Sequence, residues 1–138
     1  MITHPNGLLC DCGHRGCYQQ YASTTALVRT ARELNPSLSN GRLIFDAMQS
    51  GDSAVKEIID SWIDEISYGL LSLIYVFNPS AILLGGGIMN QHYIVGRLRE
   101  IVAANLISSF TDVNLLPTAL GNLAGVYGMR SVVEHSTA

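Results

Sequence analysis

The stretch Cys10-Asp11-Cys12-Gly13-His14-Arg15-Gly16-Cys17 places three thiols within eight residues. Gly13 and Gly16 allow the chain to fold back so that the sulfurs converge. Thiolates are soft ligands that suit tetrahedral zinc, and three of them fill three of its four positions. On spacing alone, a structural zinc site and three unliganded thiols are equally consistent with the sequence. The fourth ligand would be His4 or His14, and we favour His4 because His14 lies inside the tight loop and would have to turn inward.

The composition indicates one globular domain. Of the 138 residues, 48% are hydrophobic and 14% are charged, which is enough apolar material for a core. The net charge of −3 and the dispersed Lys and Arg predict no nucleic-acid or anionic-membrane surface. The longest apolar run, residues 66–77, is shorter than the roughly 20 residues that a bilayer requires. No secretory signal opens the chain, so we expect a cytoplasmic protein, in which clustered cysteines more often bind metal than form disulfides.

Hydrophobic periodicity predicts a helix-rich α/β body behind the cysteine loop. The expected elements are a loop over 1–17, helices over 19–34, 41–50, 53–77, 97–109 and 119–134, and strands over 81–84 and 113–116. Residues expected to face the core in the first two helices are Leu27, Val28, Ala31, Leu34, Leu43, Ile44, Ala47 and Met48. Ser23 can cap an inner segment of the first helix, and Asp52 or Ser53 can cap the longest one. That longest helix is apolar all round after Ile66, so its second half should be deeply buried.

A glycine triplet, Gly85-Gly86-Gly87, follows the first predicted strand. One interpretation is simply a tight exit from the strand. The functional interpretation is a surface where the backbone approaches a nucleotide, because ligands of open α/β sheets bind beyond the carboxyl ends of the strands. Gly121 and Gly125 would either line the same cleft or serve helix packing.

Taken together, these motifs resemble those of the ROK family of sugar kinases and sugar-sensing repressors (repressor, open reading frame, kinase). The family's zinc motif, CxCGxxGC followed by YAS, stands here at residues 10–17 and 21–23. The resemblance continues in the family's order at 78–87, 119–122 and 124–125, and so covers almost the whole chain. It implies the C-terminal lobe of the actin-like ATPase / ribonuclease H-like fold.

On this resemblance, residues 1–138 form a single partial domain, with a zinc-loop segment over 1–20 and a helical α/β body over 21–138. The three cysteines would hold a structural zinc. The family's fourth ligand belongs to a Gly-His pair whose position falls immediately before Met1. Zinc could persist with His4 or water as the fourth ligand, or its binding could be weak or lost.

The resemblance also implies two ligand contacts. Gln19 stands where the family has a glutamate that contacts sugar hydroxyls, so it is the expected substrate-binding residue, without that residue's charge. The glycine triplet takes the place of the family's adenosine-contacting turn.

The implied function is glucokinase-like phosphorylation of a hexose or N-acetyl-hexosamine, with ATP and magnesium as cofactors of the complete protein. Such kinases carry a phosphate motif and a catalytic Asp in an N-terminal lobe, and neither precedes Cys10 here. We therefore assign no catalytic residue and expect the isolated chain to be inactive. Two alternatives stay open, namely the sugar-sensing lobe of a ROK-type repressor and a non-catalytic remnant or interaction module.

The expected partners are sugar and ATP in the complete protein, together with a second copy of the chain. The apolar helix over 66–77 would normally be covered by strands that lie upstream. We therefore expect the isolated chain to self-associate and so hide this surface. No membrane and no direct nucleic-acid binding is expected.

Overall fold

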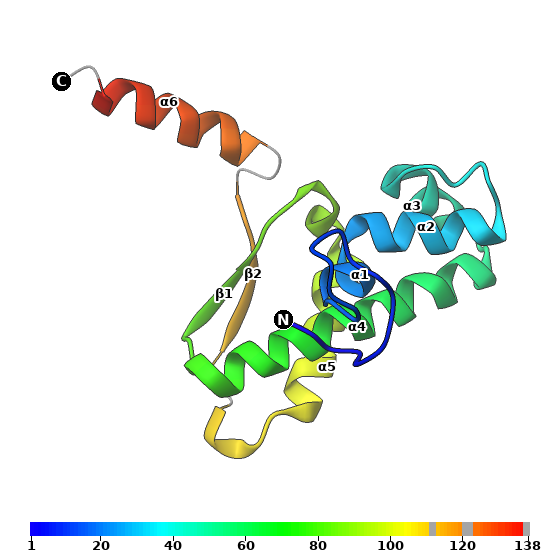
Figure 1. Ribbon diagram of the computed structural model, residues 1–138, viewed down its shortest axis with the longest axis horizontal. Coiled ribbons are helices and arrows are strands. Elements are labelled where there is room, and N and C mark those ends of the chain that lie inside the picture. Colours follow the sequence, from blue (N-terminus) through cyan, green and yellow to red (C-terminus); the bar gives the residue numbers. More distant parts are fainter. Residues whose placement is uncertain (111–112, 120–122, 137–138) are drawn as a thin grey trace.

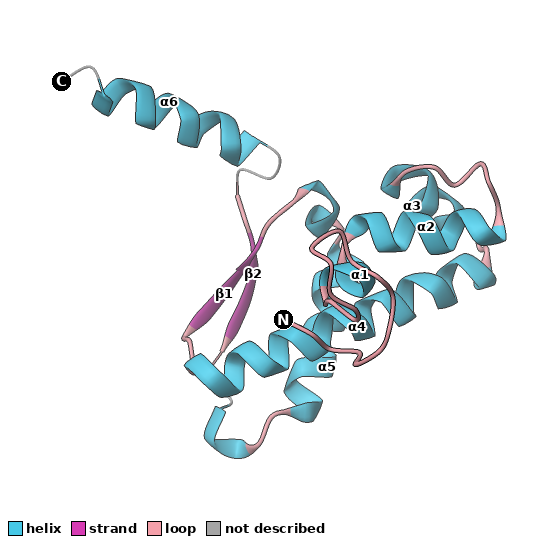
Figure 2. Cartoon of the chain, viewed as in Figure 1, coloured by secondary structure: helices cyan, strands magenta, loops and turns pink. Residues whose placement is uncertain are grey.

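The computed structural model describes residues 1–110, 113–119 and 123–136, which form a loop, a group of helices and a small sheet (Figure 2). The helices and strands are α1 Gln19–Ala22, α2 Thr24–Leu34, α3 Gly41–Gln49, α4 Ser53–Phe77, β1 Ala81–Leu84, η1 Gly87–Asn90, α5 His92–Asn105, η2 Ser108–Phe110, β2 Asn114–Pro117 and α6 Ala124–Ser136.

The long helix α4 runs through the body, with α1, α2 and α3 packed on one side of it and α5 on another (Figure 1). Its buried apolar residues recur every three or four positions, as the sequence predicts. They are Val55, Ile59, Trp62, Ile63, Ile66, Leu70 and Ile74. The Asp52 carboxylate caps its first turn by accepting a hydrogen bond from the Val55 amide at 3.1 Å, and Asn78 ends the helix in the left-handed conformation with φ 42°.

The helix predicted over 19–34 is divided into two by Ser23. The backbone of Ser23 is extended, with ψ 157°, and the Ser23 Oγ accepts a hydrogen bond from the Ala26 amide at 3.1 Å. The cap expected at Ser23 is therefore present. The Trp62 indole donates to the Ser23 carbonyl at 2.9 Å, so the break is fixed against α4 and both α1 and α2 pack on that helix.

Strands β1 and β2 form a parallel pair, with Ala81 opposite Asn114 and Leu84 opposite Pro117. Helix α5 connects them, and its Arg99 guanidinium donates twice to the Leu115 carbonyl, at 3.0 and 2.7 Å. Leu84 and Leu115 are buried beneath the helices. The alternate strand residues Leu83 and Leu116 are exposed on the opposite face, as the two-residue period of a strand requires. Helix α6 projects away beyond the end of the sheet (Figure 1).

Several expected boundaries and burial assignments are wrong. Helix α5 begins at His92 instead of 97. Its N-cap residue Gln91 makes no side-chain capping hydrogen bond, so no capping residue in the sequence marks this end of the helix. The last helix begins at Ala124 instead of 119. Leu34 and Leu43 are exposed, since Leu34 lies at the very end of its helix and Phe45 occupies the core in place of Leu43.

The second half of α4 is buried on one face only, through Ile66, Leu70 and Ile74. Val76 is 73% and Phe77 70% exposed, because among the described residues the neighbouring helices cover only part of the circumference of α4. Within residues 1–110, 113–119 and 123–136, none of the helices combines the length and hydropathy needed to cross a bilayer.

Candidate metal centre and ligand hollows

The loop over residues 1–18 brings the three cysteine sulfurs together. The Sγ atoms of Cys10, Cys12 and Cys17 all lie within 4.8 Å of one another, and those of Cys12 and Cys17 are 3.5 Å apart. A tetrahedral zinc with Zn–S bonds of 2.3 Å requires about 3.8 Å between its sulfurs. The three thiols therefore fit three corners of a zinc site with small side-chain adjustments.

Two glycines make this convergence possible. Gly13 and Gly16 have φ values of 84° and 74°, in the left-handed region that favours glycine. At Gly16 a Cβ would lie 1.6 Å from the His4 carbonyl oxygen, so the backbones of the two loop arms touch there. The turn between them is closed by the Cys10 amide, which donates to the His14 carbonyl at 2.8 Å.

The thiols also alter one another's protonation. Hydrogen bonds from the backbone and the thiol of Cys12 lower the pKa of Cys10 to about 7. The hydrogen bond between Cys17 and Cys12, with desolvation, raises the pKa of Cys17 to about 11. At neutral pH the Cys10 thiol is therefore partly ionised, whereas that of Cys17 stays protonated. A metal ion that binds the loop would displace the protons that remain on the sulfurs.

His4, the histidine favoured from the sequence as fourth ligand, is not brought to the sulfurs. Its Nδ1 lies 3.1 Å from Thr3 Oγ1 and its Nε2 3.4 Å from Glu65 Oε1. Its ring stacks on Tyr21 with the centroids 3.9 Å apart. His14 instead places Nδ1 3.6 Å from Cys12 Sγ. In this conformation the nearer histidine is the one that the sequence argument disfavoured.

The loop is anchored to the helices by residues that the sequence analysis did not single out. The Tyr18 hydroxyl donates to the Ile66 carbonyl at 2.8 Å, and burial raises the pKa of Tyr18 to about 12. The Arg29 guanidinium donates to the Gln20 carbonyl at 2.7 Å and to its side-chain oxygen at 3.2 Å. The Gln20 side chain in turn hydrogen-bonds Cys10. No sequence signal marks these contacts, because their partners are up to 48 residues apart.

Gln19, the predicted sugar contact, is the first residue of α1 and is exposed to solvent. It lies two residues beyond Cys17, directly after the cysteine loop. Its contact with a sugar stays a prediction.

The glycine triplet lines a hollow of about 670 Å³ at the carboxyl end of β1, opposite α3. Gly86 has φ 102°, so a side chain there would be strained. Across the hollow lie Arg42 and Asp46 of α3, whose side chains form an ion pair at 3.9 Å. The position and size are those of a ligand site in an open α/β fold. Of the other glycines considered, Gly125 is exposed on α6 and Gly121 lies outside the described residues.

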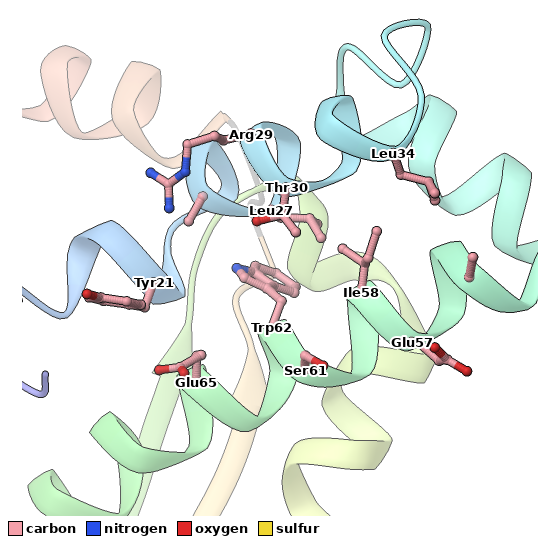
Figure 3. A pocket seen from close by; sticks show the side chains of 12 residues that line it. Tyr21, Leu27, Arg29, Thr30, Leu34, Glu57, Ile58, Ser61, Trp62 and Glu65 are labelled. Carbon is pink, nitrogen blue, oxygen red and sulfur yellow. The ribbon is translucent and has the colours of Figure 1, made fainter. Parts of the chain in front are cut away.

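A second hollow, of about 490 Å³, opens between α2 and α4, and we call it the α2–α4 groove (Figure 3). The sequence analysis did not foresee it. It is lined by Tyr21, Ala26, Leu27, Arg29, Thr30, Leu34, Ala54, Glu57, Ile58, Ser61, Trp62 and Glu65.

Comparison with known proteins gives a consistent result. The ROK family model matches residues 1–136. The chain is 31% identical to a glucokinase of Thermotoga maritima, over 97% of this chain and 47% of that protein. It is also 31% identical to the xylose repressor of Bacillus spizizenii, over 94% of this chain and 34% of that protein.

Among solved structures, a ROK family glucokinase from Streptomyces griseus in complex with glucose and AMPPNP matches with a TM-score of 0.83 and 28% identity, over 96% of this chain and 49% of that one. The chain therefore spans about half or less of the length of these relatives. Its fold is that of the C-terminal lobe of the actin-like ATPases, helix-rich and with two strands among the described residues.

Proposed function

The chain belongs to the ROK family, and on that premise we propose that it forms the C-terminal part of an ATP-dependent kinase of a hexose or N-acetyl-hexosamine. One observation carries the proposal. The hollow between the glycine triplet and α3 has the volume and the position expected of a nucleotide site, in a fold shared with a kinase that binds AMPPNP.

Each part of the site has its own role in this proposal. The backbone of Gly85, Gly86 and Gly87 would lie against the nucleotide, since the absence of side chains allows close approach. Arg42 and Asp46 offer a cation and an anion across the hollow. ATP would supply the phosphoryl group, and magnesium would offset its charge. No carboxylate of the chain is assigned as the base.

The cysteine loop would have a structural role. Cys10, Cys12 and Cys17 would hold zinc, and the ion would fix the loop that leads into α1. Gln19 would then meet a sugar hydroxyl as a neutral donor and acceptor. Because an uncharged amide hydrogen-bonds more weakly than a carboxylate, we expect the contact to be weaker than one made by glutamate.

A sugar-sensing lobe of a repressor is the second candidate function, and the identity with the xylose repressor favours it. The kinase and the repressor functions differ in whether they require a bound nucleotide. A kinase lobe must bind ATP, whereas a sensor needs the sugar alone.

The experiment is a titration of the chain with AMPPNP and magnesium by calorimetry, with a matched pair of variants. Gly86→Ala should abolish binding, while Gly51→Ala should leave it unchanged. Both glycines have positive φ and open space around the added Cβ, but only Gly86 lines the hollow. Both substitutions therefore place a side chain at a position of positive φ, and only Gly86→Ala should change AMPPNP binding.

Turnover provides the second readout. The chain alone should transfer no phosphoryl group from ATP to glucose, fructose or N-acetyl-hexosamines. Supplied with the N-terminal half of a ROK glucokinase, it should do so. Absence of both AMPPNP binding and complemented turnover, with sugar binding retained, would assign the chain to the repressors, and absence of all three would leave a non-catalytic module.

A further inference from the structure

The three cysteines of the loop differ in how far solvent reaches them. All three are free thiols. Cys12 is exposed, in the turn that the hydrogen bond between Cys10 and His14 closes. Cys17 is half-buried, and Cys10 is only 8% exposed. Because the oxidation of a cysteine depends on its access to solvent, a small oxidant should reach Cys12 first.

Cys17 presents a second thiol to Cys12. The two Sγ atoms are 3.5 Å apart, whereas a disulfide bond is about 2.05 Å long. Cys17 directly precedes Tyr18, whose hydroxyl is anchored to the Ile66 carbonyl of α4. Cys12 lies beside Gly13, which has open space around it. The exposed turn can therefore carry Cys12 to Cys17 without moving the anchored end of the loop.

Cys10 is the less suitable partner for Cys12. Only one residue separates the two, so a disulfide between them would close a very short and stiff loop. Cys10 is also buried, and the Gln20 side chain hydrogen-bonds its thiol. An exposed cysteine beside a second, resolving cysteine is the arrangement found in redox sensors. In this loop the two roles fall to Cys12 and Cys17.

We propose that Cys12 and Cys17 form a reversible disulfide on reaction with a peroxide, and that this bond and zinc binding exclude each other. The Cys12 sulfur attacks hydrogen peroxide, the O–O bond breaks, and the products are a sulfenic acid and one water molecule. The Cys17 sulfur then attacks the Cys12 sulfur, the S–O bond breaks, and the hydroxyl group leaves as water with the Cys17 proton. Two thiols are oxidised and one peroxide is reduced to two water molecules.

Zinc and the disulfide compete for the same sulfurs. Zinc binds thiolates, and a sulfur in a disulfide is no longer one. Oxidation would leave Cys10 as the only thiol of the loop, too few for a structural zinc site. This second half of the inference rests on the proposed role of the cysteine loop, whereas the disulfide itself requires no metal. Peroxide would thus release the ion that fixes the loop leading into α1.

The disulfide is tested on the metal-free chain. After treatment with hydrogen peroxide and then iodoacetamide, the chain is digested with trypsin. Cleavage at Arg15 places Cys10 and Cys12 in the peptide 1–15 and Cys17 in the peptide 16–29. The two peptides should be joined in the non-reduced digest and separate on reduction, and fragmentation should find the iodoacetamide label on Cys10.

Three matched variants identify the pair. Cys10→Ser should keep the joined peptides, whereas Cys12→Ser and Cys17→Ser should lose them. Circular dichroism checks that each variant keeps its helices. Peptides that stay separate in the oxidised wild type would overturn the proposal. So would peptides that remain joined in Cys12→Ser, or a label found on Cys12 in place of Cys10.

Zinc release is measured on the zinc-loaded chain with a colorimetric zinc indicator. Peroxide should release one zinc ion for each disulfide formed, and a thiol reductant should restore binding. A chain that forms the disulfide and keeps its zinc would refute the exclusion. Failure of the wild-type chain to bind zinc would instead refute the proposed role of the loop, and the test on the metal-free chain would still decide the disulfide.

Discussion

The ring of Tyr18 lies directly against the backbone of Gly69, where an added Cβ would come within 2.3 Å of Tyr18 Cζ. Since Tyr18 follows Cys17 and donates to the Ile66 carbonyl, this contact seats the cysteine loop on α4. A glycine in the middle of a helix costs about 1 kcal/mol relative to alanine. At Gly69 the lack of a side chain lets the cysteine loop approach α4.

We predict that Gly69→Ala destabilises the fold by about 1–3 kcal/mol, the usual cost of overpacking, despite the better helix propensity of alanine. The displaced Tyr18 should also loosen the cysteine loop and lower its zinc affinity. Urea unfolding followed by circular dichroism measures the first effect, and a colorimetric zinc competition measures the second.

Gly96→Ala is the matched control, because Gly96 also lies inside a helix, α5, and has nothing within 4 Å of an added Cβ. It should stabilise the chain by about 0.5–1 kcal/mol. If both substitutions were stabilising, the proposed Tyr18 contact would be wrong.

The cysteine loop should bind one zinc ion per chain. Cys12→Ser should abolish stoichiometric binding, because it removes the thiol that hydrogen-bonds both of the others. Elemental analysis of the purified chain and of this variant makes the comparison. Chelation of the wild-type zinc should lower the melting temperature, since the metal binds only the folded loop. If chelation left the melting temperature unchanged, zinc would have no structural role in this chain.

The two histidines should respond differently. His14→Ala should weaken zinc binding, because His14 Nδ1 is 3.6 Å from Cys12 Sγ. His4→Ala should retain zinc and instead lose stability by about 1 kcal/mol, since Glu65 and Tyr21 lose their partner. The opposite result would restore His4 as the fourth ligand.

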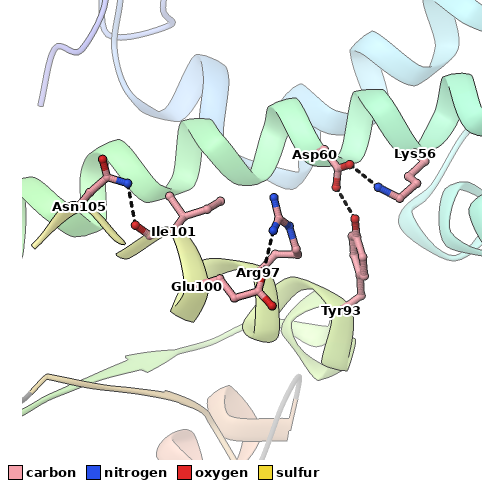
Figure 4. Close-up of polar contacts among 7 residues, drawn as sticks. All are labelled: Lys56, Asp60, Tyr93, Arg97, Glu100, Ile101 and Asn105. Carbon is pink, nitrogen blue, oxygen red and sulfur yellow. Dashed lines mark hydrogen bonds and ion pairs between the residues drawn. The ribbon is translucent and has the colours of Figure 1, made fainter. Parts of the chain in front are cut away.

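Acid should weaken the contact between α4 and α5. Asp60 accepts hydrogen bonds from Lys56 Nζ and from the Tyr93 hydroxyl, each at 2.5 Å (Figure 4). Burial raises the pKa of Asp60, but these two hydrogen bonds outweigh it and the pKa is lowered overall. A carboxyl group with a lower pKa in the folded chain stabilises fully above its unfolded pKa of about 3.9, and the effect is lost as the pH falls through the folded value.

Asp60→Asn should therefore be less stable than the wild type by about 1 kcal/mol at pH 7, with the difference shrinking below about pH 4. Unfolding by urea at a series of pH values gives this dependence. Asp64→Asn, one turn further along α4 and exposed, should show no such trend. Parallel curves for the wild type and Asp60→Asn down to pH 2 would refute the assignment.

The sequence predicted correctly those helices and strands whose ends carry capping or helix-breaking residues. Asp52 and Asn78-Pro79 mark the ends of α4, and the run Ala81 to Leu84 forms β1 as expected. The spacing of the three cysteines and two glycines predicted that the sulfurs converge, because every residue involved lies in one short loop. Where no such signal exists, as at Gln91 before α5, the boundary was missed.

By itself, the sequence determined the helix-rich α/β class, the long central helix and the convergence of Cys10, Cys12 and Cys17, since these follow from hydrophobic period, caps and local spacing. Only the tertiary structure decided which histidine lies near the sulfurs, that the glycine triplet faces α3, and that α2 and α4 leave a groove between them. The physical reason is that these relationships join residues distant along the chain. Their approach depends on packing against α4, which no local pattern encodes.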